Sequence, residues 1–300
     1  QIATLHAHCY RALGRPAIAE ANIKEWNDRN PYKKLAVKTK HDPLKENAED
    51  AVQVNSYVEQ GYNDYNRLRA KMVPRGRWGR HVREFAEPWE AWKQETGYLD
   101  FGDLIGQALL DCDRAPGDPH FIYADESQDL SRLEAAILLA WSKRAYVIFV
   151  GDADQALFGF RGADPDAMID LPVPEKHRNV LEQSYRVPKA VRDRALSLIQ
   201  RIKHRDPVTF LPRDEPGEVR RLAMSFKDAE QILGDAEQYD GKIVMFLASC
   251  AYMLNPLIAV MRKRGLTFHN PYRETDGRWN PLRTRPNAVM ARDRVEAFLS

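Results

Sequence analysis

Residues 121–161 read FIYADESQDLSRLEAAILLAWSKRAYVIFVGDADQALFGFR, and this stretch decides the fold that we predict. Two short apolar runs, 121–124 and 146–150, have the composition of buried strands, and carboxylates follow each of them. A Ser-x-x-Glu capping box between the runs predicts a helix over 131–141. A strand, a helix and a second strand in so short a space predict a right-handed unit with two parallel strands.

The polar residues that follow the two predicted strands are candidates for a nucleotide site. Ligands of open parallel sheets bind at the carboxyl ends of the strands, so we expect Asp125, Glu126, Asp152 and Gln155 to converge. An acidic pair suits nucleotide hydrolysis, because one carboxylate can hold Mg²⁺ while its neighbour orients the attacking water. Asp125 fits the first role and Glu126 the second. Such a pair taken alone is more often a cap of a helix or turn.

Five segments in a fixed order give this pair a wider context. They are TLHAHCYRALG at 4–14, LDFGDLI at 99–105, DESQD at 125–129, GDADQALFGFRGAD at 151–164 and LEQSYRVPKAV at 181–191. In order and spacing they resemble the UvrD/Rep family of superfamily 1 DNA helicases. Residues 246–273 resemble a strand and helix of the family's second motor domain. The resemblance implies an α/β fold of RecA-like P-loop NTPase motor domains, parallel sheets flanked by helices, with an inserted helical subdomain.

The resemblance also implies roles in an ATP site that uses Mg²⁺. Its catalytic residues would be Glu126, Gln155 and Arg186. Gln155 would sense the γ-phosphate, and Arg186 would act as an arginine finger across a cleft. The ATP-binding residues would be Asp125, Tyr185 and Asp152, with Tyr185 stacked on adenine and Asp125 as the metal ligand. As a plain alternative, a glutamine at the start of a loop is often only a turn residue.

The expected partner is single-stranded DNA or a junction of single and double strands. The implied DNA contacts are Thr4, His6, Phe158, Phe160 and Arg161, to which a basic run adds Arg75, Arg77 and Trp78. That run, RLRAKMVPRGRWGRHVR at 67–83, contains no acidic residue and suits a surface that follows a phosphate backbone. The family generally has Trp where Phe160 stands. The alternatives are a structural histidine, core phenylalanines and a solvated basic loop.

The motifs also predict how the chain is organised. A partial first motor domain would consist of residues 1–14 and 96–175, and an inserted helical DNA-binding subdomain, punctuated by prolines, would consist of 15–95. Part of a second motor domain would follow at 176–270, and a second insertion would start at 271–300. In the second motor domain we expect strands at 179–181, 219–222 and 243–247, and helices at 187–203, 227–239 and 252–264. No stretch of the sequence approaches the roughly 20 apolar residues of a membrane span, and the three cysteines lack metal-ligand spacing. We therefore expect a cytoplasmic protein. It would be bacterial, nucleoid-associated or phage-encoded.

One departure from the family limits the activity expected of these 300 residues. No G-x-x-x-x-G-K-[ST] string, which would bind the ATP phosphates, occurs in the sequence. We therefore expect an incomplete chain, inactive alone, from an ATP-dependent helicase or translocase that moves 3′ to 5′ on single-stranded DNA. Repair, recombination and phage replication all stay open as its pathway. The alternatives are a non-catalytic DNA-binding or regulatory protein and part of a helicase-nuclease. The presence of Glu126, Gln155 and Arg186 favours the enzyme.

Overall fold

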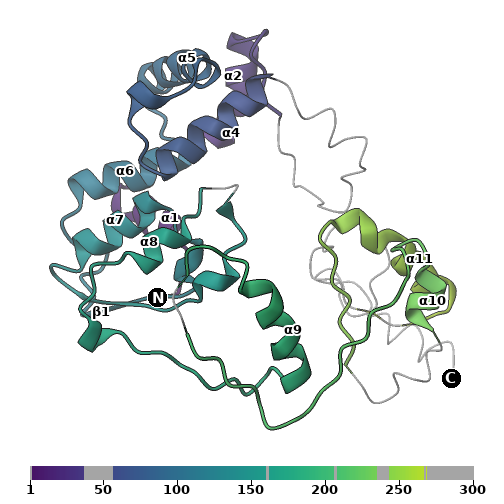
Figure 1. Cartoon of the computed structure of the whole chain (residues 1–300). Coiled ribbons are helices and arrows are strands. Elements are labelled where there is room, and N and C mark those ends of the chain that lie inside the picture. The colour runs from purple at the N-terminus through teal and green to yellow at the C-terminus, as the bar shows by residue number, and fades with distance from the viewer. Residues whose placement is uncertain are drawn as a thin grey trace, which may run out of the picture. The chain divides into compact units, whose positions relative to one another are not determined.

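The computed structural model of the chain describes residues 2–36, 57–159, 162–205, 208–234, 243–266 and 268 (Figure 1). The described residues group into two compact units, one with residues up to 220 and the other with residues from 221 onward. The first unit therefore also holds residues 176–220, which the sequence assigned to a second motor domain. That assignment stays a prediction.

A strand–helix–strand unit forms the centre of the first compact unit, as predicted. β1 (Phe121–Ala124) and β2 (Tyr146–Phe149) pair in parallel, with Phe121 opposite Tyr146 and Ala124 opposite Phe149. Between them α7 (Arg132–Trp141) begins at the expected capping box. The backbone N–H of Ser131 donates to the Glu134 carboxylate at 2.9 Å, and the Glu134 N–H donates to the Ser131 hydroxyl at 3.2 Å. These bonds satisfy two backbone donors that an α-helix leaves free at its start.

Helices cover one face of the strand pair. α1 (Leu5–Ala12), α6 (Phe101–Asp111) and α7 lie on this face (Figure 1). Their buried side chains form one cluster with the inward side chains of both strands. The strand side chains on this face are Ile122, Ala124, Val147 and Phe149. On the opposite face Tyr123 and Tyr146 are 71% and 73% exposed. The period-2 alternation of the strands thus buries one face of the pair within this chain.

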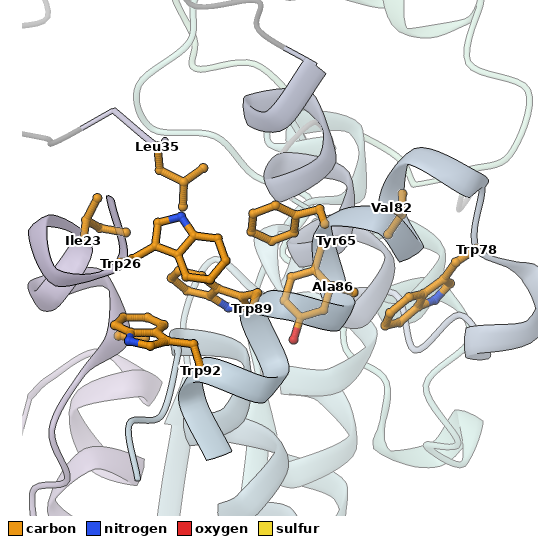
Figure 2. Packing of buried hydrophobic residues seen from close by; sticks show 11 residues of the cluster. Ile23, Trp26, Leu35, Tyr65, Trp78, Val82, Ala86, Trp89 and Trp92 are labelled. Atoms are coloured by element: carbon orange, nitrogen blue, oxygen red, sulfur yellow. The ribbon is translucent and has the colours of Figure 1, made fainter. Parts of the chain in front are cut away.

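The described part of the region 15–95 consists of helices joined by turns and loops. It contains α2 (Ile23–Arg29), α4 (Tyr57–Ala70) and α5 (Arg80–Thr96), which share a core of aromatic side chains (Figure 2). The rings in this core belong to Trp26, Tyr65, Trp78, Phe85, Trp89 and Trp92. The centroids of Trp26 and Trp89 are 5.1 Å apart at an interplanar angle of 75°. Edge-to-face pairs of this kind add to the stabilisation that burial alone provides.

Pro88 lies inside α5, whereas the sequence pattern suggested that prolines interrupt this region. A proline inside a helix lacks the N–H that would bond to the carbonyl four residues earlier, here that of Glu84. The ammonium of Lys33 donates to this carbonyl at 2.8 Å. A side chain from outside the helix therefore supplies the missing donor, which a local sequence pattern does not reveal.

The strands predicted at 179–181, 219–222 and 243–247 are wrong for this structure, because these described residues form no strand. Leu181, Leu222 and Leu247 are 87%, 58% and 84% exposed. A strand forms only where a neighbour accepts its hydrogen bonds, so apolar composition alone does not create one.

The helices expected in this part of the chain do form, although they are shorter than predicted. They are α9 (Lys189–Ile199), α10 (Ala229–Leu233) and α11 (Asn255–Lys263). Residues 271–300, the expected second insertion, lie outside the described residues. No helix in the part of the chain that the structure describes is both long and apolar enough to cross a membrane.

Candidate functional site

The carboxyl ends of β1 and β2 bring the predicted acidic residues to one edge of the sheet. The strand ladder continues past the strands, since the Val150 N–H donates to the Ala124 carbonyl at 2.8 Å and the Ser127 N–H to the Val150 carbonyl at 2.9 Å. Asp125 and Glu126 follow β1, and Asp152 follows Gly151 beyond β2. Their side chains are exposed and accessible to a ligand.

Glu126 has an unusual backbone conformation. Its φ of 52° and ψ of 44° lie in the left-handed region, which favours glycine over residues with a side chain. The Asp125 carboxylate accepts the Glu126 N–H at 3.0 Å, and the Gln128 side-chain amide donates to the Glu126 carboxylate at 2.7 Å. Backbone strain of this kind concentrates at functional sites. The conformation thus gives the Glu126 carboxylate a defined position at the strand ends.

Asp152 and Gln155 form a second fixed element beside the acidic pair. Asp152 caps the short 3₁₀ turn Ala153–Gln155 by accepting the Asp154 N–H at 3.0 Å. The Gln155 amide donates to the other Asp152 oxygen at 2.6 Å. Asp154 pairs with Arg205 from the segment after α9 at 2.6 Å, a contact that the sequence did not suggest. The turn is therefore held from both sides, with Gln155 exposed.

The donor atoms at this edge fit a hard cation that binds together with phosphates. Mg²⁺ prefers oxygen ligands and usually takes one or two protein carboxylates, with water and substrate oxygens completing its shell. Asp125 offers such an oxygen at the end of β1. Within the described ranges, no cluster of three or more His, Cys, Asp or Glu side chains is arranged to hold a metal ion.

Thr4 and His6 have structural contacts at the start of α1. The Thr4 hydroxyl caps this helix by accepting the Ala7 N–H at 3.3 Å, and Thr4 is exposed. The His6 ring lies 5.8 Å from the Phe101 ring, and its Nδ1 is 3.7 Å from the Glu134 carboxylate. These contacts place Thr4 at the N-terminus of α1 and His6 next to α6 and α7. The proposed DNA contacts of both residues remain predictions.

Of the other predicted contact residues outside the basic run, those that the structure describes are exposed. Phe158 is 37% exposed, whereas Phe160 and Arg161 lie outside the described residues. Tyr185 is 87% exposed, and Arg186 is exposed beside it. The backbone N–H groups of Arg186 and Val187 donate to the Ser184 hydroxyl at 3.3 and 3.0 Å. The Tyr185 ring is thus available for stacking but is not packed against the strand ends.

The basic run is less available for DNA than its charge suggested. Trp78 is 7% exposed, packs 5.6 Å from the Tyr65 ring, and donates its indole N–H to the Val73 carbonyl at 2.9 Å. Its ring therefore cannot stack on a base in this structure, because the aromatic core occupies it. Arg75 pairs with Glu90. Arg77 is exposed at the surface.

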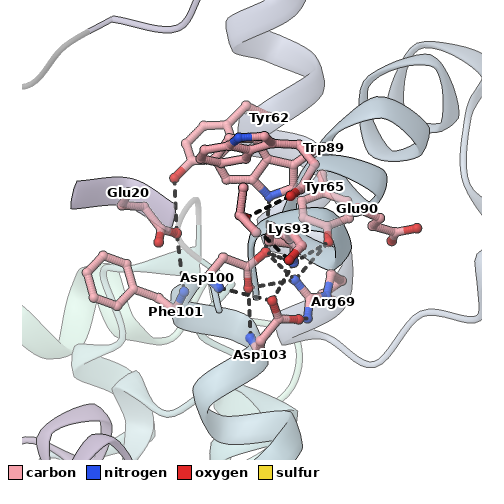
Figure 3. A network of polar contacts seen from close by, with 12 residues as sticks. Glu20, Tyr62, Tyr65, Arg69, Trp89, Glu90, Lys93, Asp100, Phe101 and Asp103 are labelled. Carbon is pink, nitrogen blue, oxygen red and sulfur yellow. Dashed lines mark hydrogen bonds and ion pairs between the residues drawn. The ribbon is translucent and has the colours of Figure 1, made fainter. Parts of the chain in front are cut away.

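A buried ion network, which the sequence did not reveal as such, joins the inserted helices to α6 (Figure 3). Asp100 is fully buried and accepts from Arg69 at 2.8 Å, from Lys93 at 2.5 Å and from the Trp89 indole at 3.1 Å. Asp103 accepts from the same two cations. Burial alone would raise the pKa of Asp100, but Arg69 and Lys93 outweigh it and hold the pKa below its usual range. The sequence signal that could have pointed to this network is the Asp-x-x-Asp spacing of Asp100 and Asp103, which forms a capping box at the start of α6.

Comparison with known proteins agrees with this geometry. Residues 1–173 match the UvrD/REP helicase N-terminal domain. Over 194 residues the chain is 28% identical to a Staphylococcus aureus protein named ATP-dependent DNA helicase PcrA, with 60% of this chain and 26% of the relative covered. A Bacillus subtilis protein of the same name is 28% identical over 155 residues, 48% of this chain and 20% of the relative.

The aligned part of the chain thus spans about a quarter of the length of these relatives. The family match covers more than half of the 300 residues and includes both strands with their acidic ends. It implies the RecA-like α/β motor fold that the parallel strand pair indicates. The chain therefore belongs to the UvrD/Rep helicase family.

Proposed function

We propose that the protein is an ATP-dependent DNA helicase or translocase that uses Mg²⁺ and moves 3′ to 5′ on single-stranded DNA. The observation that supports this most strongly is the convergence of Asp125, Glu126, Asp152 and Gln155 at the carboxyl edge of a parallel strand pair. The family membership and the names of the relatives agree with it.

The proposed chemistry assigns one task to each side chain. Asp125 holds Mg²⁺, which neutralises charge on the ATP phosphates when it is bound. Glu126 accepts a proton from the attacking water. Gln155 senses the γ-phosphate through its exposed amide, and Arg186 neutralises charge in the transition state when the cleft closes. Tyr185 stacks on the adenine ring.

The proposed DNA contacts allow movement on any sequence. An aromatic face accepts every base, so Phe158 and Phe160 can hold successive bases while Arg161, Thr4 and His6 contact the backbone. We propose single-stranded DNA and strand junctions as the partner. We also propose a cytoplasmic location, because the DNA of a bacterial cell lies in the cytoplasm.

Replacement of Glu126 tests this function. In the full-length protein, Glu126→Gln should lower DNA-stimulated ATP hydrolysis about 100-fold or more, because the water loses its proton acceptor. The affinity for a labelled single-stranded oligonucleotide, measured by fluorescence anisotropy, should stay within about twofold of the wild-type value, since Glu126 is not one of the proposed DNA-contacting residues. Glu175→Gln, at an exposed glutamate outside the site, is the matched control.

Two results would contradict the proposal. If the wild-type protein binds DNA but never hydrolyses ATP, a regulatory DNA-binding role replaces the helicase. If the Glu126→Gln variant hydrolyses ATP at the wild-type rate, Glu126 is not the base.

A further inference from the structure

Gln128 lies buried between the two strand ends, and both atoms of its side-chain amide are used. It is 2% exposed. Its Nε2 donates to the Glu126 carboxylate at 2.7 Å, and its Oε1 accepts the backbone N–H of Asp152 at 3.0 Å. One side chain therefore bridges the segment after β1 and the segment after β2.

The two bonds fix the orientation of the amide. Rotating the Gln128 amide by half a turn would place its oxygen against the Glu126 carboxylate and its NH₂ against the Asp152 N–H. Both contacts would then be repulsive, because each would pair like with like. The partners therefore select one orientation, in which the NH₂ faces the carboxylate.

Gly151 gives the amide its space. A Cβ at position 151 would lie 2.4 Å from the Gln128 Oε1 and 2.9 Å from the Ser127 backbone nitrogen. The φ of Gly151 is not in the left-handed region, so the glycine is needed for this approach rather than for its own conformation. Glycine after a strand often marks a close approach of this kind.

The bridge continues to the proposed phosphate sensor. The Asp152 carboxylate accepts the Gln155 amide at 2.6 Å, so a hydrogen-bonded path runs from Glu126 through Gln128 and Asp152 to Gln155. From this path we propose that Gln128 is a positioning residue that orients the Glu126 carboxylate and links it to the loop that carries Gln155. The inference rests on the proposed ATP hydrolysis. Movement of Gln155 upon phosphate binding or release would pull on Asp152 and, through the amide, reorient Glu126.

Replacement of Gln128 by Glu tests the link to Glu126 directly. This change keeps an acceptor for the Asp152 N–H but places a second carboxylate against Glu126. Two adjacent carboxylates disfavour full ionisation, so the acid limb of the pH profile of kcat should move up by about one pH unit or more. The value of kcat at neutral pH should fall about 10- to 100-fold, the range found when a residue that orients a metal ligand is replaced.

A purely structural residue would change stability without moving the pH profile. Gln107→Glu is the matched control, because exposed Gln107 also donates its amide to a carboxylate, that of Asp111, far from the site in sequence. Its profile should overlay that of the wild-type protein. An unshifted profile for the Gln128→Glu variant, with wild-type kcat, would overturn the proposal.

Gly151→Ala gives a second route that adds no charge. The new methyl group should displace the Gln128 amide, lower kcat about 10-fold or more and leave DNA affinity unchanged. Hydrogen exchange of the Asp152 amide, followed by mass spectrometry on a peptide that spans 151–155, should become faster in this variant. Unchanged exchange together with unchanged kcat would contradict the bridge.

The outcomes separate this inference from the proposed function. If the wild-type protein hydrolyses ATP, Glu126→Gln abolishes the activity, and both the Gln128→Glu and Gly151→Ala variants behave as wild type, the positioning role fails alone. If the wild-type protein does not hydrolyse ATP, the proposed function fails and the positioning role with it.

Discussion

Glu20 shows how one buried carboxylate can weaken the packing around it. One of its oxygens accepts the Phe101 N–H at 3.2 Å and the Tyr62 hydroxyl at 3.4 Å. Its other oxygen is buried and has no hydrogen-bond partner among the described residues. Burial, reinforced by the nearby Asp100 charge, raises the pKa of Glu20 to about 7. The ionised form is therefore poorly accommodated where the inserted helices meet α6.

This raised pKa predicts a pH dependence of stability. Between the ordinary pKa of 4.5 and about 7, the folded protein keeps a proton on Glu20 that the unfolded chain has released. The free energy of unfolding should therefore fall as the pH rises through this window. Glu20→Gln should remove this loss and stabilise the protein at pH 8 by about 1–3 kcal/mol, with little gain near pH 4.5.

Urea unfolding at several pH values measures this effect. Glu87→Gln, at an exposed glutamate of α5, is the control and should leave the pH dependence as in the wild type. A gain from Glu20→Gln that is the same at every pH would show that ionisation of Glu20 is not its cause.

At the scale of elements, α5 depends on Lys33 for a hydrogen bond that Pro88 cannot make. The Lys33 carbonyl is itself fixed, because the Trp26 indole donates to it at 2.9 Å. Lys33→Met should lower the free energy of unfolding by about 1–2 kcal/mol, since the half-buried Glu84 carbonyl would lose a charged donor. Thermal unfolding followed by circular dichroism measures this change.

The neighbouring lysine and the proline itself provide the controls. Lys34→Met, at an exposed position, should change the free energy of unfolding by less than about 0.5 kcal/mol. Pro88→Ala restores an N–H that can reach the Glu84 carbonyl, so Lys33→Met should cost less in that background. An equal cost in both backgrounds would exclude the Lys33 bond as the reason.

Elements differed in how well local sequence predicted them. α7 and α11 were predictable because their signals are local: the capping box at Ser131, and Gly265 with a φ of 66° after α11. The segment 243–247 has strand composition but no strand, because pairing depends on a neighbour that a local pattern does not specify. Pro88 was misjudged for the same reason, since Lys33 lies 51 residues from the Glu84 carbonyl that it contacts.

At the scale of the first compact unit, the buried ion network ties the inserted helices to the strand–helix core. Arg69 comes from α4, Lys93 from α5, and Asp100 is the N-cap of α6. Asp100→Asn keeps a capping side chain but removes the charge between the two cations. We expect the free energy of unfolding to fall by about 3–5 kcal/mol, because breaking a buried pair leaves uncompensated charge.

An exposed ion pair gives the comparison. Asp118→Asn removes the partner of Arg114, 2.8 Å away at the surface, and should cost less than about 1 kcal/mol. Similar losses from both substitutions in urea unfolding would show that the buried network contributes no more than a surface pair.

The sequence by itself determined the parallel strand pair, the capped helix between the strands and the acidic residues at their ends, because these depend on short-range periodicity and caps. It also determined the family, through motifs that remain recognisable without coordinates. Only the tertiary structure showed that Gln128 bridges Glu126 and Asp152, that Trp78 belongs to the core, and that Lys33 completes α5. Each of these features depends on residues that only folding brings into contact. Hydrogen-bond partners and burial are set by such contacts, so a local sequence pattern does not specify them.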